Sequence, residues 1–133
     1  MFDKLLSMIA PHHCYICQKT GPILCDCCKK HILQQQKCHD LDFVKFQASE
    51  QVFCLEQGDI CLKKMIYDYK LHSRRAYAAV FASLISHYVL NEPKLVIVPI
   101  PTMRLSYLKR GFGHMELVAQ ELGRLGYCCQ TLL

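Results

Sequence analysis

Two closely spaced pairs of cysteines near the N-terminus constrain this chain more than any other feature. They follow the pattern Cys14-x2-Cys17-x7-Cys25-x2-Cys28. Each pair places two thiolates on one side of a tight loop, and four thiolates are a ligand set that tetrahedral Zn(II) favours. Gly21-Pro22 lies between the pairs, where a chain reversal would bring them together. Four protein ligands leave no open coordination position, so the pattern predicts structural rather than catalytic zinc.

The sequence leaves the identity of the fourth ligand open. Cys27 could take the place of Cys28, although a two-residue spacer is the usual geometry and favours Cys28. Other nearby residues with a suitable donor atom are His12, His13, His31, Cys38 and His39. Cysteines also serve as small buried hydrophobic residues. We favour that interpretation for the more distant ones, which are Cys54, Cys61, Cys128 and Cys129.

The redox environment decides whether ten cysteines in 133 residues form disulfides or bind metal. Residues 1–10 carry an acid in their charged part, and their short apolar stretch is broken by Ser7, so they do not resemble a signal peptide. The longest mostly apolar run, residues 76–90, is too short to span a bilayer. We therefore predict a cytoplasmic protein without membrane insertion, in which thiols stay reduced and clustered cysteines bind metal.

The hydrophobic pattern predicts an α/β protein. With 52% hydrophobic and 20% charged residues, the chain does not have the composition of a disordered segment. The pattern indicates helices over residues 2–9, 28–36, 74–90 and 114–125, a further helix after Asp59, and strands over residues 51–55, 94–100 and 127–133. The order strand, helix, strand at the C-terminal end predicts a parallel sheet with a right-handed crossover.

The predicted strand over residues 94–100 is apolar on both of its faces, which fits a central strand of a parallel sheet. A sheet of two or three strands cannot cover such a strand on both sides. We therefore expect an incomplete sheet, whose last strand is covered by a partner or by a second copy of the chain.

A basic turn that contains glycine follows this strand. It carries Arg104, Lys109 and Arg110 in a loop, and Gly111 lies just before the next helix. Ligands bind beyond the carboxyl ends of strands in α/β sheets, and helix N-termini attract anions. The turn is therefore a candidate phosphate or pyrophosphate site, and a solvated basic loop is the alternative interpretation.

Motifs in a fixed order extend over nearly the whole chain. After the two cysteine pairs come Tyr69-Lys70 before an apolar helix, Val-Pro-Ile-Pro at residues 98–101, Arg-Gly-Phe at residues 110–112, His114, and Leu-Val-Ala at residues 117–119. This order and spacing resemble the ComF/GntX family of phosphoribosyltransferase-like proteins. The family is associated with natural competence, the handling of imported single-stranded DNA.

The resemblance implies a domain organisation and a set of site residues. Residues 1–40 are expected to form an N-terminal helix and a zinc-ribbon module. Residues 41–133 are expected to form the N-terminal portion of an α/β domain similar to type I phosphoribosyltransferases. The residues expected on the pyrophosphate side of phosphoribosyl pyrophosphate (PRPP) are Lys70, Arg104, Lys109, Arg110 and Gly111.

The chain departs from the family pattern in two respects. No second Cys-x-x-Cys pair lies between Cys38 and Cys54. The acidic pair followed by a threonine-rich loop, which holds the ribose phosphate of PRPP in the family, is also missing. The nearest acidic pair, at residues 40–42, precedes the predicted parallel strands. We expect the chain to correspond to the N-terminal part of a family member, with PRPP bound only by a full-length homologue and no phosphoribosyl transfer by residues 1–133.

A zinc-ribbon module that binds single-stranded nucleic acid or a protein partner, such as a competence protein, is the alternative function. The basic residues that favour it are Lys29, Lys30, Lys37, Lys63, Lys64, Lys70, Arg74 and Arg75. Tyr67, Tyr69 or Tyr77 would be available to stack on bases. The formal net charge is only +5, and a zinc–tetrathiolate site would lower it further. Local patches rather than the whole chain would therefore bind nucleic acid.

Overall fold

A computed structural model of the protein describes residues 12–34, 37–39, 52–54, 60–89 and 93–131. The chain divides into two compact units, Met1–Lys63 and Lys64–Leu133. The predicted helix over residues 2–9 and the predicted domain boundary at residue 40 lie outside the described residues. Among the described residues, none of the helices combines the length and the apolar character needed to cross a membrane.

The first unit contains a loop, a short helix and a two-stranded sheet. The loop leads into helix α2 (Asp26–Gln34), which begins with an acidic residue at the positive end of the helix dipole. Strand β1 (Lys37–His39) pairs antiparallel with β2 (Val52–Cys54). The structure confirms the predicted helix, which starts two residues earlier than expected, and the predicted strand at β2. The sequence pattern did not predict β1.

Helix α3 (Ile60–Leu71) carries the boundary between the two units. Leu62, Met65 and Tyr69 are buried, and their spacing of three and four residues places them on one face of the helix. The lysines at positions 63, 64 and 70 are exposed. The structure confirms the helix predicted after Asp59, and its apolar and basic faces have the spacing of an amphipathic helix.

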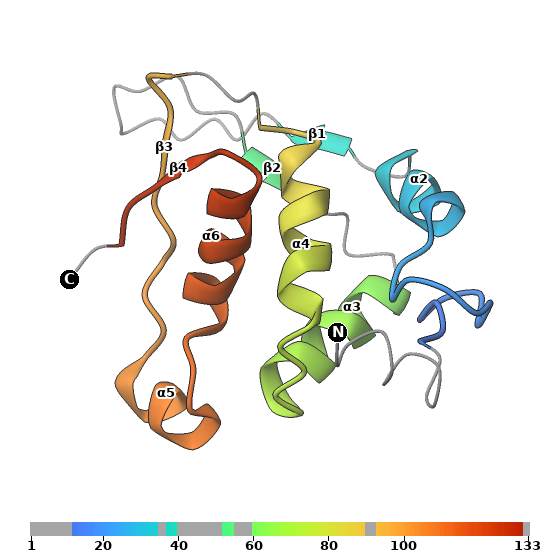
Figure 1. Ribbon diagram of the computed structural model, residues 1–133, viewed down its shortest axis with the longest axis horizontal. Coiled ribbons are helices and arrows are strands. Elements are labelled where there is room, and N and C mark those ends of the chain that lie inside the picture. Colours follow the sequence, from blue (N-terminus) through green and yellow to red (C-terminus); the bar gives the residue numbers. More distant parts are fainter. Residues whose placement is uncertain (1–11, 35–36, 40–51, 55–59, 90–92, 132–133) are drawn as a thin grey trace, which may run out of the picture. The chain divides into compact units, whose positions relative to one another are not determined.

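The second unit is built on two helices that lie side by side, α4 (Tyr77–Ser86) and α6 (His114–Arg124) (Figure 1). Both helices bury small residues, which are Ala78 and Ala82 of α4 and Ala119 of α6. Small side chains let two helix axes approach closely. The larger Leu122 of α6 is also buried, and the ring centroid of Phe81 on α4 lies 5.4 Å from that of Tyr69. Helix α4 is shorter than the predicted helix over residues 74–90.

A short parallel sheet flanks α6. Strand β3 (Val96–Ile97) pairs with β4 (Cys128–Cys129), with Val96 opposite Cys128 and Ile97 opposite Cys129. Gly126 ends the intervening helix with a φ of 97°, a left-handed conformation that favours glycine. The structure therefore confirms the predicted order strand, helix, strand and the parallel pairing. The protein is mixed α and β, with a two-stranded parallel sheet in the part of the second unit that the structure describes.

The burial predicted for the strand over residues 94–100 is wrong. Only residues 96 and 97 form the ladder, and the exposed fractions of Leu95, Val96, Val98 and Ile100 are 40%, 42%, 44% and 78%. Strand β3 pairs with β4 at only two positions. So short a ladder covers little of the apolar run over residues 94–100, and most of the run is therefore exposed. The predicted basic loop also differs, because it contains a helix, α5 (Arg104–Arg110), which ends at Gly111.

Candidate metal centre

The first cysteine pair lies in a loop that backbone hydrogen bonds hold closed. The Cys14 N–H donates to the Lys19 carbonyl at 2.8 Å, and the Gln18 N–H donates back to the Cys14 carbonyl at 2.9 Å. An isolated bridge pairs His13 with Thr20, and Gly21 follows it with a φ of 147°. The antiparallel bridge means that the chain has already reversed direction between Cys14 and Lys19. It then bends again at Gly21-Pro22 and returns toward the first pair, since the Tyr15 N–H donates to the Ile23 carbonyl at 2.8 Å.

The second cysteine pair lies at the start of α2. Cys25 immediately precedes the helix, and its carbonyl accepts the Lys29 N–H at 2.9 Å. Cys28 lies three residues later in the first turn, so the two side chains project from the same side of the helix. Its buried neighbour on that face is Ile32, one turn further on.

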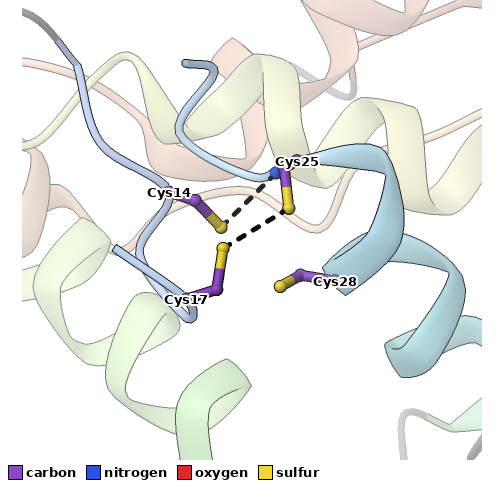
Figure 2. A group of neighbouring side chains, drawn as sticks. All are labelled: Cys14, Cys17, Cys25 and Cys28. Atoms are coloured by element: carbon purple, nitrogen blue, oxygen red, sulfur yellow. Dashed lines mark hydrogen bonds between the residues drawn. The ribbon is translucent and has the colours of Figure 1, made fainter. Parts of the chain in front are cut away.

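The four thiols converge on one point (Figure 2). All four Sγ atoms lie within 4.8 Å of one another, and the Sγ atoms of Cys17 and Cys25 are 3.7 Å apart. Four sulfurs around a tetrahedral zinc ion, each about 2.3 Å from the metal, are separated by about 3.8 Å. The cluster therefore fits a single metal ion with four thiolate ligands after a small contraction of its widest pairs.

The thiols of the cluster do not ionise alike. Burial alone would raise the pKa of the Cys14 thiol. Hydrogen bonds from the backbone N–H groups of Cys25, Cys17 and Ile16 stabilise the thiolate more strongly, and the pKa falls to about 6. The Cys25 N–H lies 3.5 Å from the Cys14 sulfur that it donates to. Burial raises the pKa of Cys28 well above its ordinary value, and hydrogen bonds to the other thiols and the charge on Cys14 add to this. Four thiolates this close need a cation between them to ionise together.

The structure separates the two candidates for the fourth ligand. Cys28 is buried within the cluster, whereas Cys27 is exposed and is not one of the four converging residues. Neighbouring residues on a helix point about 100° apart, so only one of the two can face the other pair. The histidines at positions 12, 13 and 31 are exposed and also lie outside the cluster. The side chains of Cys38 and His39 are not among those that the structure describes.

The residues of the predicted anion site lie on two elements of the second unit. Lys70 is exposed on α3, and Arg104 and Lys109 are exposed on α5. The side chain of Arg110 is outside the described part of the chain. Gly111 adopts a left-handed conformation with a φ of 73°, and its N–H donates to the Tyr107 carbonyl at 2.8 Å, which ends α5.

Arg75 also belongs to this region, although the sequence did not single it out there. Its guanidinium lies 4.9 Å from the centre of the Phe112 ring and donates to the Gly111 carbonyl at 3.5 Å. Phe112 itself is buried. No short-range pattern links residue 75 to residues 111 and 112, so this contact could be found only from the fold.

Glu116 fixes the turn after β3 to the start of α6. Its carboxylate accepts the Thr102 N–H at 3.1 Å and the Thr102 hydroxyl at 2.9 Å. Burial raises the pKa of Glu116, but hydrogen bonds from Thr102 and its own backbone, together with His114, outweigh it and lower that pKa below its ordinary value. A glutamate three residues after the helix N-cap, here Gly113, is half of the capping-box pattern and was the available sequence signal.

Tyr69 connects α3 to the start of α6. Its hydroxyl donates to the His114 carbonyl, and its ring centroid lies 5.4 Å from that of Phe81 and 6.0 Å from that of Phe112. Burial, followed by the negative charges of Glu116 and Glu121, raises the pKa of Tyr69 to about 12. The residue before Lys70 is therefore a core residue of the second unit.

Comparisons of this chain with protein-family models, with curated proteins and with solved structures give no match. One candidate region is a set of four converging thiols that could hold a metal ion. The other is an exposed basic turn between β3 and α6, whose backbone is held by Thr102, Glu116 and Arg75.

Proposed function

We propose that this protein is a ComF-like member of the phosphoribosyltransferase-like proteins, in which four N-terminal cysteines hold one structural Zn(II). The observation that carries the zinc part of the proposal is the convergence of the four Sγ atoms within 4.8 Å. Thiolates are soft ligands, and a tetrahedral set of four is typical of zinc. Because all four positions are filled by protein, the ion would stabilise the fold and take no part in chemistry.

The small core around the cysteines supports a structural role for the metal. Among the described residues from 12 to 34, the buried hydrophobic ones are Cys14, Leu24, Cys28 and Ile32. Two of these four are proposed ligands, so little apolar surface remains to offset the loss of chain entropy on folding. Segments this small commonly depend on a metal or on disulfides for stability. A zinc ion would supply that stability here.

The family part of the proposal rests on the motifs of the second unit. The parallel pair β3 and β4 with α6 between them is compatible with the start of a phosphoribosyltransferase-like sheet. The basic turn follows the carboxyl end of β3, where α/β proteins bind their ligands. Arg104 and Lys109, both exposed on α5, would contact pyrophosphate there, with Lys70 adding charge. A role in competence follows from the resemblance and is part of the same proposal.

Metal content tests the zinc site directly. Purified protein is expected to contain one zinc per chain by elemental mass spectrometry, and Cys28→Ser is expected to lose most of it. Cys27→Ser is the matched control, since that thiol is adjacent in sequence but exposed and outside the cluster. Equal zinc content in the two variants, or a protein that binds no zinc when refolded with it, would contradict the proposal.

Pyrophosphate titration followed by NMR tests the anion site. We expect amide shifts at residues 104–111 and their loss in the double variant Arg104→Ala/Lys109→Ala. The control is Lys63→Ala/Lys64→Ala, because these lysines are exposed on α3. It removes the same number of positive charges at another place in the protein and should leave the shifts unchanged. Shifts that both double variants weaken equally would indicate nonspecific attraction to the net positive charge and would refute a site at α5.

A second function, binding of single-stranded nucleic acid by the basic face of α3, is favoured by one specific observation. Tyr67 is 59% exposed on the helix that carries Lys63, Lys64 and Lys70, so a base could stack on its ring. Tyr69 and Tyr77 are buried and are not available for stacking. Binding of an oligonucleotide that weakens with salt and with Tyr67→Ala would support this function, and no binding at low salt would remove it.

A further inference from the structure

The four thiols of the cluster differ in their access to solvent. Cys14 and Cys28 are buried, with Cys14 completely inaccessible at 0% exposure. Cys17 and Cys25 lie nearer the surface. Oxidation of cysteine by a dissolved oxidant requires that the oxidant reach the sulfur, so accessibility selects Cys17 and Cys25 as the reactive members.

The same two residues are also close enough to react with each other. Their Sγ atoms are 3.7 Å apart, which is van der Waals contact for sulfur, and Figure 2 shows the two side chains pointing at one another. They come from different pairs, one from the loop and one from the residue before α2. A bond between them would join the two Cys-x-x-Cys pairs and remove two of the four thiols that could hold a metal ion.

We propose that Cys17 and Cys25 are an oxidation site, at which a hydroperoxide converts the two thiolates into a disulfide and displaces the bound metal. The more exposed Cys17 attacks the peroxide, so that a sulfur–oxygen bond forms, the O–O bond breaks and the leaving hydroxide takes up a proton. The product is a sulfenic acid on Cys17. The Cys25 thiolate then attacks that sulfur, the S–S bond forms, the S–O bond breaks and a second hydroxide leaves as water after protonation. Two thiolates, one hydrogen peroxide and two protons thus give one disulfide and two waters.

Loss of the metal follows from the ligand count. After oxidation only Cys14 and Cys28 remain as thiolates, and two ligands do not hold a structural zinc ion. This consequence rests on the proposed zinc function, whereas formation of the disulfide does not. The cluster would therefore act as a reversible sensor of peroxide, because a dithiol reductant restores all four ligands.

The test titrates the zinc-loaded protein, and separately the metal-free protein, with hydrogen peroxide. Zinc release is followed with a chromogenic chelator, and disulfides are mapped by mass spectrometry. Trypsin cleaves after Lys4, Lys19 and Lys29, so Cys14 and Cys17 share one peptide and Cys25, Cys27 and Cys28 share the next. Fragmentation of the crosslinked pair then identifies the two sulfurs. We expect about one zinc released per peroxide consumed, a Cys17–Cys25 disulfide in both forms, and recovery of zinc binding after reduction.

Cys27→Ser is the matched control, because its thiol is exposed and outside the cluster, and its loss simplifies the mapping. The variant should release zinc and form the disulfide as the unchanged protein does. A disulfide that links Cys14 with Cys17, Cys25 with Cys28, or Cys27 with any partner would overturn the proposal, as would sulfinic acid without a disulfide. Protein that forms the Cys17–Cys25 disulfide but never binds zinc would refute the zinc function and leave the oxidation site standing.

Discussion

The link between Thr102 and Glu116 is the contact of the second unit whose removal gives the most specific outcome. The carboxylate accepts two hydrogen bonds, at 3.1 Å from the Thr102 N–H and at 2.9 Å from its hydroxyl. Glu116→Ala removes both and leaves the Thr102 N–H without its partner. It also removes a negative charge from the first turn of α6, where the helix dipole favours one.

The size of the effect can be worked from these contacts. Hydrogen bonds to a charged group contribute about 1.5–3 kcal/mol each, and partial exposure of the carboxylate places this pair at the low end of that range. The dipole adds about 0.5 kcal/mol. Because the two bonds share one carboxylate they are not additive, and we expect Glu116→Ala to lower the free energy of unfolding by about 2–3 kcal/mol.

The assay is urea denaturation followed by circular dichroism at 222 nm, since the chain contains no tryptophan and α4 and α6 supply much of its helical signal. Glu121→Ala is the matched control. It removes a glutamate from the same helix whose partner Arg124, at 2.6 Å, is largely exposed, and such a pair is worth about 0.5 kcal/mol or less. Equal destabilisation by the two variants would refute the reasoning, because it would mean that the two hydrogen bonds from Thr102 to Glu116 add no more stability than an exposed ion pair on the same helix.

The remaining predictions concern ionisation, packing, the metal and activity. Tyr69 should titrate near pH 12 when followed by ultraviolet absorbance at 295 nm. Because the pKa of Tyr69 is higher in the folded protein than in the unfolded chain, its contribution to stability is complete below the ordinary tyrosine pKa. That contribution is lost as the pH rises through the pKa of the folded protein. Gly113→Ala should destabilise the protein in urea by an amount that falls to near zero in the Glu116→Ala background, since a Cβ at residue 113 would collide with the Glu116 carboxylate. Chelation of the metal should increase hydrogen exchange in residues 12–34 while the helices of the second unit stay protected. Purified residues 1–133 should produce no pyrophosphate from PRPP and an acceptor base in a coupled enzymatic assay, and turnover above the level of a denatured control would refute that expectation.

The stability contributed by Glu116 should also depend on pH, and the direction of its pKa shift determines whether stability rises or falls with pH. The folded pKa is lowered below the ordinary glutamate value. The stabilisation is therefore fully present above the ordinary value and is lost as the pH falls through the lowered one. Glu116→Gln should remove this part of the acid dependence, and an unchanged acid dependence in that variant would show that another carboxylate is responsible.

Local patterns predicted those features that depend on residues close in sequence. The two cysteine pairs converge because each lies in a single turn, with a bend at Gly21-Pro22 between them. The buried face of α3, carrying Met65 and Tyr69, follows from helical periodicity alone. The choice of Cys28 over Cys27 could be made from the usual spacer, and the start of α2 at Asp26 gives it a physical reason, because it fixes which thiol faces the first pair.

The features that the sequence did not predict depend on contacts between distant residues. Strand β1 consists of Lys37, Cys38 and His39, which have no strand-like pattern and are extended because β2 pairs with them. Helix α5 lies where the basic residues suggested a loop. Its leucines at positions 105 and 108 are exposed, so the helix is not marked by a buried apolar face. The helix has only 7 residues, which is too short a window for helical periodicity to be recognised in the sequence.

The position of Glu116 bears on where an anion could bind. The sequence placed a candidate phosphate site at the start of the last helix, because helix N-termini attract anions. In the structure a carboxylate of the chain itself already accepts hydrogen bonds there, and its lowered pKa keeps it charged at neutral pH. A phosphate at the same place would meet a like charge a few ångströms away, which disfavours binding. Any anion in this region is therefore better placed beside Arg104 and Lys109 of α5 than at the N-terminus of α6, and Glu116→Gln should strengthen rather than weaken pyrophosphate binding.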